Sequence, residues 1–352
     1  MQELLKVQPL DEAAVLAAKK RWDAVAKPLH GLGRLEDMIA RIAGIQGSDE
    51  AALAPRCALV FCSDNGVVAQ GVSQSESVVT QLVARSIAEG EANVNLMAAV
   101  SGTDVLAVDI GMNEEIDHPA ILVRKAARGT GDISLGPAMT RAQAEETVRA
   151  GMALVGEMKA RGYRMIATGE MGIGNTTTAA AVACAMLGCA PERIAGRGAG
   201  LSDAGLARKV AVIERALEVN RPDARDALDV LAKVGGYDIA GMTGAFLGGA
   251  VHRVPVVIDG AISAVAALLA VSLCPTARAY MLPSHVSREP AAGLIMERLG
   301  LMPVVHADMA LGEGTGAVAL FPLLDMAANV YRGTHTFGRL GMDAYTPQGG
   351  GA

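Results

Sequence analysis

The stretch YRMIATGEMGIGNTTTAAAVACAM, residues 163–186, decides the fold class that we expect for this chain. It begins with a short, mostly apolar run, YRMIAT, that is typical of a buried strand. It ends in an alanine-rich run that is typical of a helix, and the glycine-rich turn GEMGIGNTTT joins the two. A strand that passes into a helix through such a turn is the repeating unit of α/β proteins.

Short β-rich runs alternate with long alanine-rich runs over most of the chain from residue 57 onward. Most of the short runs are continuously apolar, as expected for strands of a parallel sheet that helices cover on both faces. We therefore expect an α/β fold with a doubly wound parallel sheet. The expected strands are residues 57–62, 105–110, 121–126, 163–168, 254–259, 277–282 and 303–308.

Polar residues and glycines gather directly after these runs. SDNGVV follows the first expected strand, PSHVS follows residues 277–282, and MALGEGTGA follows residues 303–308. The carboxyl ends of parallel strands meet at one edge of the sheet, where α/β proteins bind their ligands. The sequence therefore predicts a ligand site at this edge.

The composition argues against several classes of function. The formal net charge of −6 makes nucleic acid an unexpected partner, because proteins that bind it usually carry a basic face. The cysteines and histidines lack metal-ligand spacing, so no metal site is expected. The most apolar stretch, residues 261–274, is too short to span a membrane. Residues 1–14 lack the apolar segment of a secretion signal, so we expect a cytoplasmic protein.

The glycine-rich turn has the properties of an anion site. Gly172 and Gly174 leave backbone N–H groups free at the start of a helix, whose dipole attracts anions. The turn is neither a P-loop nor a dinucleotide fingerprint, since Gly174 is followed by Asn175 and Thr176. The alternative is a helix that Asn175 or Thr176 simply caps. Glu170 would repel phosphate, so we expect it to face a ribose hydroxyl or a developing cation.

Glu313 lies between Gly312 and Gly314 on a second turn of the same kind. A general base needs a raised pKa, which apolar neighbours such as Leu311 would provide. The alternative is an acidic residue that only stabilises the N-terminus of its helix. We expect the carboxylates of Glu170 and Glu313 to converge on one crevice.

Two further residues allow two interpretations each. Lys209 lies in a predicted helix among apolar neighbours, and the alternative to a functional lysine is a solvated helix face. His285, in SHVSREP, is either a catalytic base or a structural histidine.

Seven motifs occur in order over nearly the whole chain. Together they resemble those of the nicotinate-nucleotide:dimethylbenzimidazole phosphoribosyltransferases, which assemble the lower ligand in cobalamin biosynthesis. The motifs are KPLHGLGRLE (27–36), SDNGVVAQGVS (63–73), GEMGIGNTTTAAA (169–181), GRGAGLSDAGLARK (196–209), VPVVIDGAISAVAAL (254–268), SHVSREP (284–290) and LGEGTGAVALFPLLDMA (311–327).

The resemblance implies a Rossmann-like parallel sheet covered by helices, with a small helical domain built from the chain ends. Residues 1–50 would begin the small domain, residues 51–332 would form the catalytic domain, and residues 333–352 would be a tail that packs with the small domain. The implied partners are nicotinate mononucleotide, an aromatic base and a second copy of the chain. No cofactor, nucleic acid or membrane is implied.

The resemblance also implies roles for residues at matching positions. Glu313 would be the general base, and Glu170 would stabilise the cationic centre or hold the ribose. The remaining residues fall into two groups. Those implied to bind the nucleotide and its phosphate are Gly172, Gly174, Asn175, Thr176, Lys209 and Ser287. Those implied to line the base pocket are Gln81, Ser75 and Leu311.

One segment departs from the family. The family commonly has GVSAYPQEVTAQMV where this chain has GVSQSESVVTQLV, residues 71–83, which is one residue shorter and lacks the aromatic residue and the proline. Ser75, Glu76 and Ser77 would leave a smaller and more polar wall where an aromatic ring would stack on a benzimidazole. We therefore expect an acceptor other than dimethylbenzimidazole, such as a phenolic compound or a purine.

Two alternatives stay open from the sequence. One is a subunit that needs a homologous partner chain for activity, which the altered segment alone supports. The other is a Rossmann-type dehydrogenase, against which the missing Gly-x-Gly-x-x-Gly after the first expected strand argues.

Overall fold

The structure is a computed structural model that describes residue 4 and residues 6–346. Within these residues the core is a six-stranded sheet of order β3-β2-β1-β4-β5-β6, in which all neighbouring strands are parallel. This arrangement confirms the predicted α/β class. The strands are β1 (Arg56–Ser63), β2 (Asp104–Gly111), β3 (Leu122–Val123), β4 (Met165–Met171), β5 (Val256–Ile258) and β6 (Met281–Pro283).

Several expected strands were wrong in length or position. Residues 121–126 form only the two-residue β3, and 254–259 only the three-residue β5. Most of 277–282 lies in the 3-10 helix η3 (Pro275–Tyr280). Residues 303–308 form no strand but one bridge to His285. Three features of residues 303–308 explain why no strand forms. The apolar part of the segment is short, Pro303 has no N–H to donate, and Asp308 has a φ of 50°.

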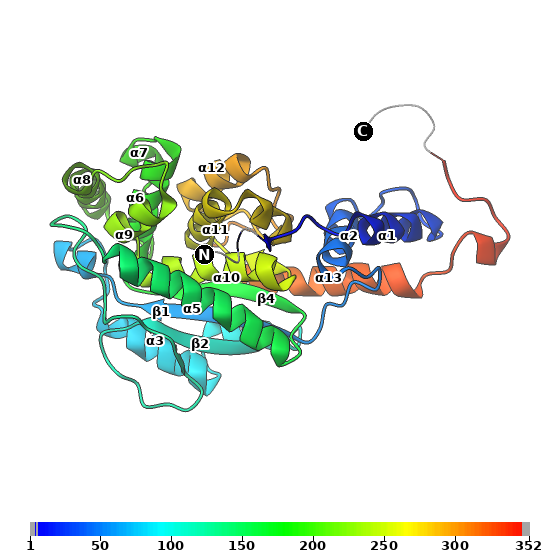
Figure 1. Cartoon of the computed structure of the whole chain (residues 1–352), viewed down its shortest axis with the longest axis horizontal. Coiled ribbons are helices and arrows are strands. Elements are labelled where there is room, and N and C mark those ends of the chain that lie inside the picture. The colour runs from blue at the N-terminus through cyan, green and yellow to red at the C-terminus, as the bar shows by residue number, and fades with distance from the viewer. Residues whose placement is uncertain (1–3, 5, 347–352) are drawn as a thin grey trace.

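Helices cover both faces of the sheet (Figure 1). Alternate residues of β1 point to opposite faces, and every one of them is buried. Cys57, Leu59 and Phe61 join a core formed with α5 (Arg141–Ala160), α6 (Asn175–Leu187), α9 (Ala227–Val234), α10 (Tyr237–His252) and α11 (Ala261–Leu273). Ala58, Val60 and Cys62 join a second core formed with α2 (Arg34–Gln46), α3 (Val78–Glu89), α4 (Asn93–Ala99) and α13 (Thr315–Gly333). Burial on both faces explains why these strands read as unbroken apolar runs.

The remaining helices complete the fold, and all but η4 add buried residues to one of the two cores. They are α1 (Glu12–Ala24), η2 (Gly66–Gln70), α7 (Pro191–Ile194), α8 (Asp203–Asn220), α12 (Pro290–Leu299) and η4 (Gly338–Leu340). None of the helices in residues 4–346 is long and apolar enough to cross a membrane.

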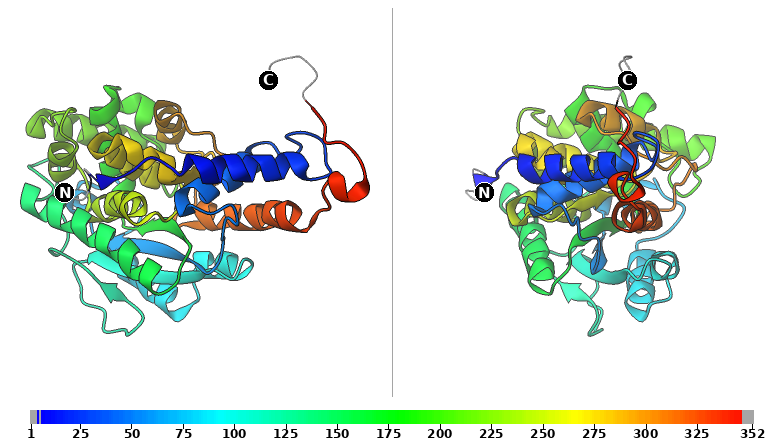
Figure 2. Two further views of the ribbon diagram at one scale, coloured as in Figure 1. Left: turned by 45° about the vertical axis from the view of Figure 1, so that its right-hand side comes forward. Right: turned by 90° about the vertical axis from the view of Figure 1, so that its right-hand side faces the viewer.

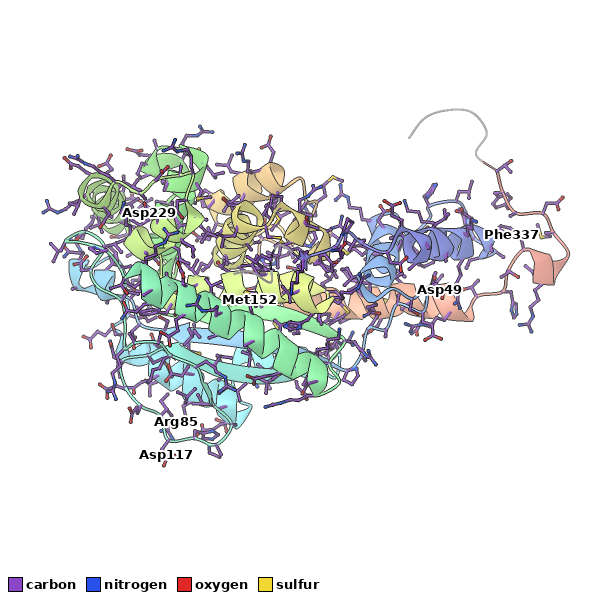
Figure 3. All side chains as sticks on the ribbon, viewed as in Figure 1. Asp49, Arg85, Asp117, Met152, Asp229 and Phe337 are labelled. Atoms are coloured by element: carbon purple, nitrogen blue, oxygen red, sulfur yellow. The ribbon has the colours of Figure 1, made fainter. Side chains whose placement is uncertain are left out.

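The two chain ends pack against each other. Helices α1 and α2 lie beside the C-terminal half of α13, away from the carboxyl edge of the sheet (Figure 2). The rings of Trp22 and Tyr331 are 4.9 Å apart, and Phe337 N–H donates to the Ala24 carbonyl at 2.9 Å. Asp49 and Phe337 both lie in this part of the molecule (Figure 3). These contacts support the predicted small domain, whose boundaries stay a prediction; residues 347–352 of the predicted tail are outside the described residues.

Helices α5 and α10 approach each other at glycines. A Cβ on Gly151 would lie 2.1 Å from the carbonyl oxygen of Gly241 in α10, and both of these glycines belong to helix backbone. No side-chain rearrangement can relieve such a contact, so the two helices would have to separate.

We expect Gly151→Ala to lower the free energy of unfolding by about 1–3 kcal/mol or more, because overpacking forces the backbone apart. Urea denaturation would measure the loss. Gly293→Ala in α12 is the matched control, since its added Cβ meets nothing within 4 Å. That substitution should raise stability by about 0.5–1 kcal/mol through helix propensity. Equal effects of the two substitutions would contradict close packing as the reason for Gly151.

Candidate functional site

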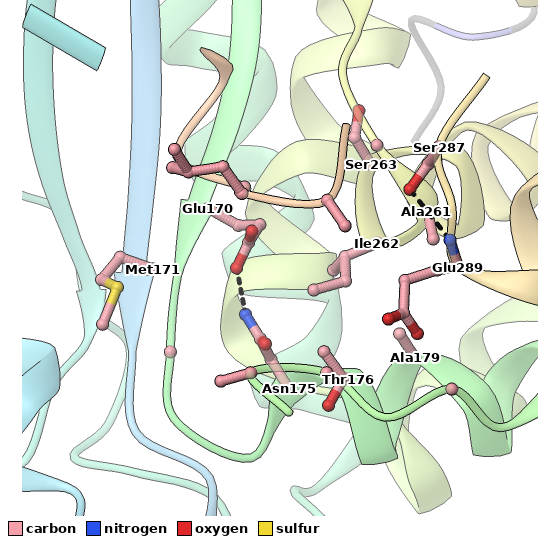
Figure 4. A pocket seen from close by; sticks show the side chains of 18 of the residues that line it. Glu170, Met171, Asn175, Thr176, Ala179, Ala261, Ile262, Ser263, Ser287 and Glu289 are labelled. Atoms are coloured by element: carbon pink, nitrogen blue, oxygen red, sulfur yellow. Dashed lines mark hydrogen bonds between the residues drawn. The ribbon is translucent and has the colours of Figure 1, made fainter. Parts of the chain in front are cut away.

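A cavity of about 350 Å³ opens at the carboxyl edge of the sheet. It is lined by the end of β4, the start of α6, the loops that follow β5 and β6, and the turn before α13. Figure 4 shows Glu170 and Asn175 on one side of it and Ser287 and Glu289 on the other. The lining residues fall within 73–83, 170–180, 194–199, 259–265, 285–291 and 310–313.

Glu170 lies on β4 itself and not on the turn after it. The strand runs to Met171, and Glu170 pairs in register with Phe61 of β1. Its carboxylate accepts a hydrogen bond from the Asn175 side-chain amide. Burial raises the pKa of Glu170 well above its usual range, and the charge of Asp238 adds to the rise. Glu170 therefore holds a proton more readily than an ordinary surface glutamate.

Glu313 occupies a strained turn at the entrance to α13. Its φ is 60°, and Gly312 and Gly314 on either side have φ values of 88° and 89°. A non-glycine residue in this region is unfavourable by about 1–3 kcal/mol and persists where the surrounding structure imposes it. Burial raises the pKa of Glu313, although the Val94 N–H, 3.4 Å away, opposes the rise. The raised pKa matches that of a general base and not that of a plain helix-stabilising carboxylate.

The two carboxylates line one cavity because their backbones meet. A Cβ on Gly169 would lie 2.5 Å from the carbonyl oxygen of Glu313, so the end of β4 and the turn before α13 are in direct contact. Asp259, which follows β5, holds the same turn: its carboxylate accepts from Gly314 N–H at 3.2 Å and Ala317 N–H at 2.9 Å. Asp259 was not among the predicted site residues, although its place at the end of an expected strand is visible in the sequence.

The start of α6 differs from the simple capped helix considered as an alternative. Its N-cap is Gly174, with a φ of 90° and no side-chain capping bond. Asn175 turns its amide to Glu170 and to Asp238, and Thr176 Oγ1 accepts from Lys209 Nζ at 2.7 Å. Both side chains thus serve the cavity wall and leave the helix terminus open to a ligand.

Lys209 is fully buried, which excludes a solvated helix face. Its Nζ donates to Thr176 Oγ1 and, at 3.1 Å, to the Gly196 carbonyl. Burial lowers the pKa of Lys209 to about 8, and the charge of Glu289 opposes this effect. Lys209 does not itself line the cavity but lies behind Thr176 and Gly196, which do. Its charge is thus held directly beneath the wall of the cavity.

Ser287 and His285 come from the loop after β6, and both line the cavity. Ser287 Oγ accepts from the Glu289 N–H at 3.3 Å. His285 is buried, with Nδ1 3.0 Å from Ser284 Oγ, and its ring packs against Gly316 at the start of α13. Burial lowers the pKa of His285, and the charge of Asp259 opposes this. The packing of the ring against α13 favours the structural interpretation of His285.

The structure brings only two of the three predicted base-pocket residues to the cavity. Ser75 and Leu311 line the cavity, together with Val79 and Val83 of α3. Gln81 does not line it. Val79 and Val83 are four residues apart and share one helix face, whereas Gln81 lies midway between them and so on the opposite side. A helix cannot present Gln81 to the same cavity as the two valines.

No metal site is apparent in the described part of the chain: it contains no group of three or more His, Cys, Asp or Glu side chains arranged to hold an ion.

Comparison with known proteins finds relatives that match nearly the whole chain. The sequence matches the family model described as "Phosphoribosyltransferase" over residues 7–341. A relative from Acetivibrio thermocellus, named nicotinate-nucleotide–dimethylbenzimidazole phosphoribosyltransferase, is 43% identical over 347 residues, or 99% of each chain. A protein of the same name from Chloroflexus aggregans is 44% identical over 97% of each chain. The crystal structure of CobT from Thermus thermophilus superposes with a TM-score of 0.89 at 38% identity, covering 94% of this chain and 99% of that one.

The buried Lys209 should make stability depend on pH. Its pKa is about 8 in the folded protein and near 10.5 in the unfolded one. The unfolded state therefore binds more protons between these values, and stability rises with pH. Relative to Lys209→Met, the wild type should gain about 2 kcal/mol of unfolding free energy between pH 7 and pH 10. Urea denaturation of both proteins across this range would measure it, and parallel curves would contradict a neutralised lysine.

Proposed function

Because the chain belongs to this phosphoribosyltransferase family, we propose that it transfers the ribose 5-phosphate of nicotinate mononucleotide to an aromatic base. The products would be nicotinate and an α-ribotide for a cobalamin-type lower ligand. The observation that carries the proposal is the pair of carboxylates with raised pKa, Glu170 and Glu313, on one cavity whose other end holds Thr176, Ser287 and the buried Lys209.

The donor end of the cavity suits a phosphate. No side chain caps the N-terminus of α6. Asn175 N–H and Thr177 N–H already donate to the Gly172 and Gly174 carbonyls, so the dipole and the remaining N–H groups can meet an anion. Thr176 Oγ1 and Ser287 Oγ line the same end, and Lys209 supplies positive charge from behind Thr176. Lys209 therefore acts on the phosphate through Thr176 or after a small movement of its Nζ.

The end of the cavity that holds Glu170 and Glu313 suits the atoms that take part in the transfer. The pyridinium ring of nicotinate mononucleotide is a good leaving group, since its bond to C1′ breaks with the electron pair going to the ring nitrogen. A nitrogen of the acceptor base, or the hydroxyl oxygen of a phenolic acceptor, attacks C1′ from the opposite face, which inverts β to α. The acceptor must lose its N–H or O–H proton, and Glu313 accepts it. Glu170 faces the positive charge that develops on the ribose, so positioning and electrostatics supply most of the acceleration.

The part of the cavity wall formed by residues 73–83 determines which acceptor base fits. Ser73, Ser75, Val79 and Val83 line the cavity, and none of them offers an aromatic ring to stack on a second ring system. We therefore infer that phenolic or purine bases are used alongside or in place of dimethylbenzimidazole. The dehydrogenase alternative is set aside, because the chain belongs to a transferase family.

The oligomeric state and the cytoplasmic location stay predictions. Both carboxylates and the donor end of the cavity come from this one chain, which supports activity without a homologous partner. Product formation by the purified chain alone would exclude the obligate heteromer. Product formation only after a homologous chain is added would establish it.

We expect Glu313→Gln to lower kcat by about 10²–10⁴-fold with little change in KM for the nucleotide, because it removes the proton acceptor but not the donor site. The assay would mix the purified chain with nicotinate mononucleotide and a set of bases, and would identify ribotides by mass spectrometry. Glu218→Gln, at an exposed position of α8, is the control and should leave the rate unchanged. Undiminished ribotide formation by Glu313→Gln would contradict the role of Glu313.

We expect Ser75→Phe to shift the acceptor preference toward dimethylbenzimidazole by about 2–10-fold, since aromatic stacking contributes about 0.5–1.5 kcal/mol. Competition between dimethylbenzimidazole and p-cresol or adenine in one reaction would give the ratio directly. A wild type that already uses all three bases equally would remove the reason for this inference.

A further inference from the structure

Asp238 lies behind the cavity and has no role in the proposed chemistry. It is the second residue of α10, is fully buried and does not line the cavity. Its Oδ2 accepts a hydrogen bond from the Asn175 side-chain amide at 2.9 Å, and the same amide nitrogen donates to Glu170 Oε2. A primary amide has two N–H donors, and each one here binds a different carboxylate.

Several contacts fix the position of the Asp238 carboxylate. Its Oδ1 accepts from the Ile239 N–H at 2.9 Å, and the N-terminal end of α10 favours a negative charge at this position. Two glycines, which have no side chain, let neighbouring backbone approach this carboxylate closely. A Cβ on Gly236 would lie 2.4 Å from Asp238 Oδ1, and one on Gly172 would lie 3.1 Å from Asp238 Oδ2. Asp238 is therefore fixed by α10, while Glu170 faces the cavity.

Resting on the function proposed above, we propose that Asp238 is a positioning residue for Glu170. It acts through the Asn175 amide and adapts the site to a ribosyl donor with a positively charged ring. The amide bridge fixes which oxygen of Glu170 turns away from the cavity, so the other oxygen faces the ligand. Figure 4 shows the Asn175 amide directed at Glu170 from the start of α6.

The charges around Glu170 give the direction of the effect. Burial and the carboxylates of Asp238, Asp259 and Glu313 all raise the pKa of Glu170, and only the amide of Asn175 lowers it. In the free enzyme these groups favour protonated Glu170. A bound pyridinium places a positive charge beside it, so the proton leaves for bulk water and the carboxylate faces the cation. The site therefore becomes complementary to a cationic ring as the ring enters.

Isothermal titration calorimetry with nicotinate mononucleotide in two buffers of different ionisation enthalpy tests whether Glu170 loses a proton when the nucleotide binds. We expect the wild type to release a proton on binding at a pH below the pKa of Glu170. Glu170→Gln should reduce this release to whatever Glu313 contributes. Asp238→Asn should lower the pKa of Glu170 and so reduce the release at the same pH. Binding by the wild type with no proton release at any pH from about 5 to about 9 would overturn the proposal, since the shift requires a change of protonation on binding.

A double-mutant cycle tests the route through Asn175. We expect Asp238→Asn and Asn175→Ala each to lower kcat by about tenfold, and the double variant to be no slower than the slower single variant, because both break one bridge. In Asp238→Asn the acid limb of the pH profile of kcat/KM should also move to lower pH. Multiplicative losses with an unmoved limb would show that Asp238 is merely structural.

Asp226→Asn is the control for loss of a carboxylate elsewhere in the fold. Asp226 caps α9 by accepting from Leu228 N–H and Asp229 N–H, and asparagine caps equally well, so no readout should change. The calorimetric test separates this inference from the proposed function. Nucleotide binding with proton release but without ribotide formation would contradict the transfer reaction and leave the positioning role of Asp238 standing.

Discussion

The site depends on the contact between the backbones of Gly169 and Glu313. The end of β4 and the turn before α13 are far apart in sequence, yet no Cβ fits between them. This contact sets Glu170, the next residue of β4, beside Glu313. Asp259 completes the arrangement from the end of β5 by accepting from the Gly314 N–H of the turn and from the Ala317 N–H in the first turn of α13. Three neighbouring segments at one sheet edge thus fix two carboxylates through the backbone that carries them.

The distribution of charge along the cavity matches a ligand that is negative at one end and positive at the other. Carboxylates with raised pKa lie at the β4 end. Hydroxyls, the terminus of α6 and a buried lysine lie at the other, together with Glu289, whose charge offsets part of that of Lys209. Burial penalises the charged forms of both Glu170 and Lys209. A ligand of opposite polarity relieves both penalties at once, which strengthens binding and stabilises the fold that holds the ligand.

The sequence predicted the central strands and the sheet edge where polar residues gather, and most of the site residues it predicted line the cavity, because long apolar runs and glycine-rich turns carry strong local signals. It failed where tertiary context decides. Residues 303–308 looked like a strand, but Pro303 and Asp308 prevent pairing. The resemblance placed Gln81 in the base pocket, and its place on α3, away from the cavity in this structure, leaves that role a prediction. Asp238 was missed because nothing near it in sequence shows that α10 would carry it to Glu170.

Helix α13 connects the reacting centre to the chain ends, and it contains one internal proline, Pro322. It begins two residues after Glu313, ends at Gly333 and is clamped to β1 midway, where Arg56 makes two bonds to Asp325 at 2.6 and 2.8 Å. Asp325 lies ten residues into the helix, or about 15 Å from its start. The Arg56–Asp325 contact therefore fixes α13 between the site and the chain ends, and Pro322, which has no N–H to donate, lies three residues before Asp325. A tilt of about 5° would move the Glu313 end by about 1 Å, a displacement that can alter the rate of a reaction about 100-fold. Substitutions around Trp22 and Tyr331, which lie far from the cavity, would then change the catalytic rate.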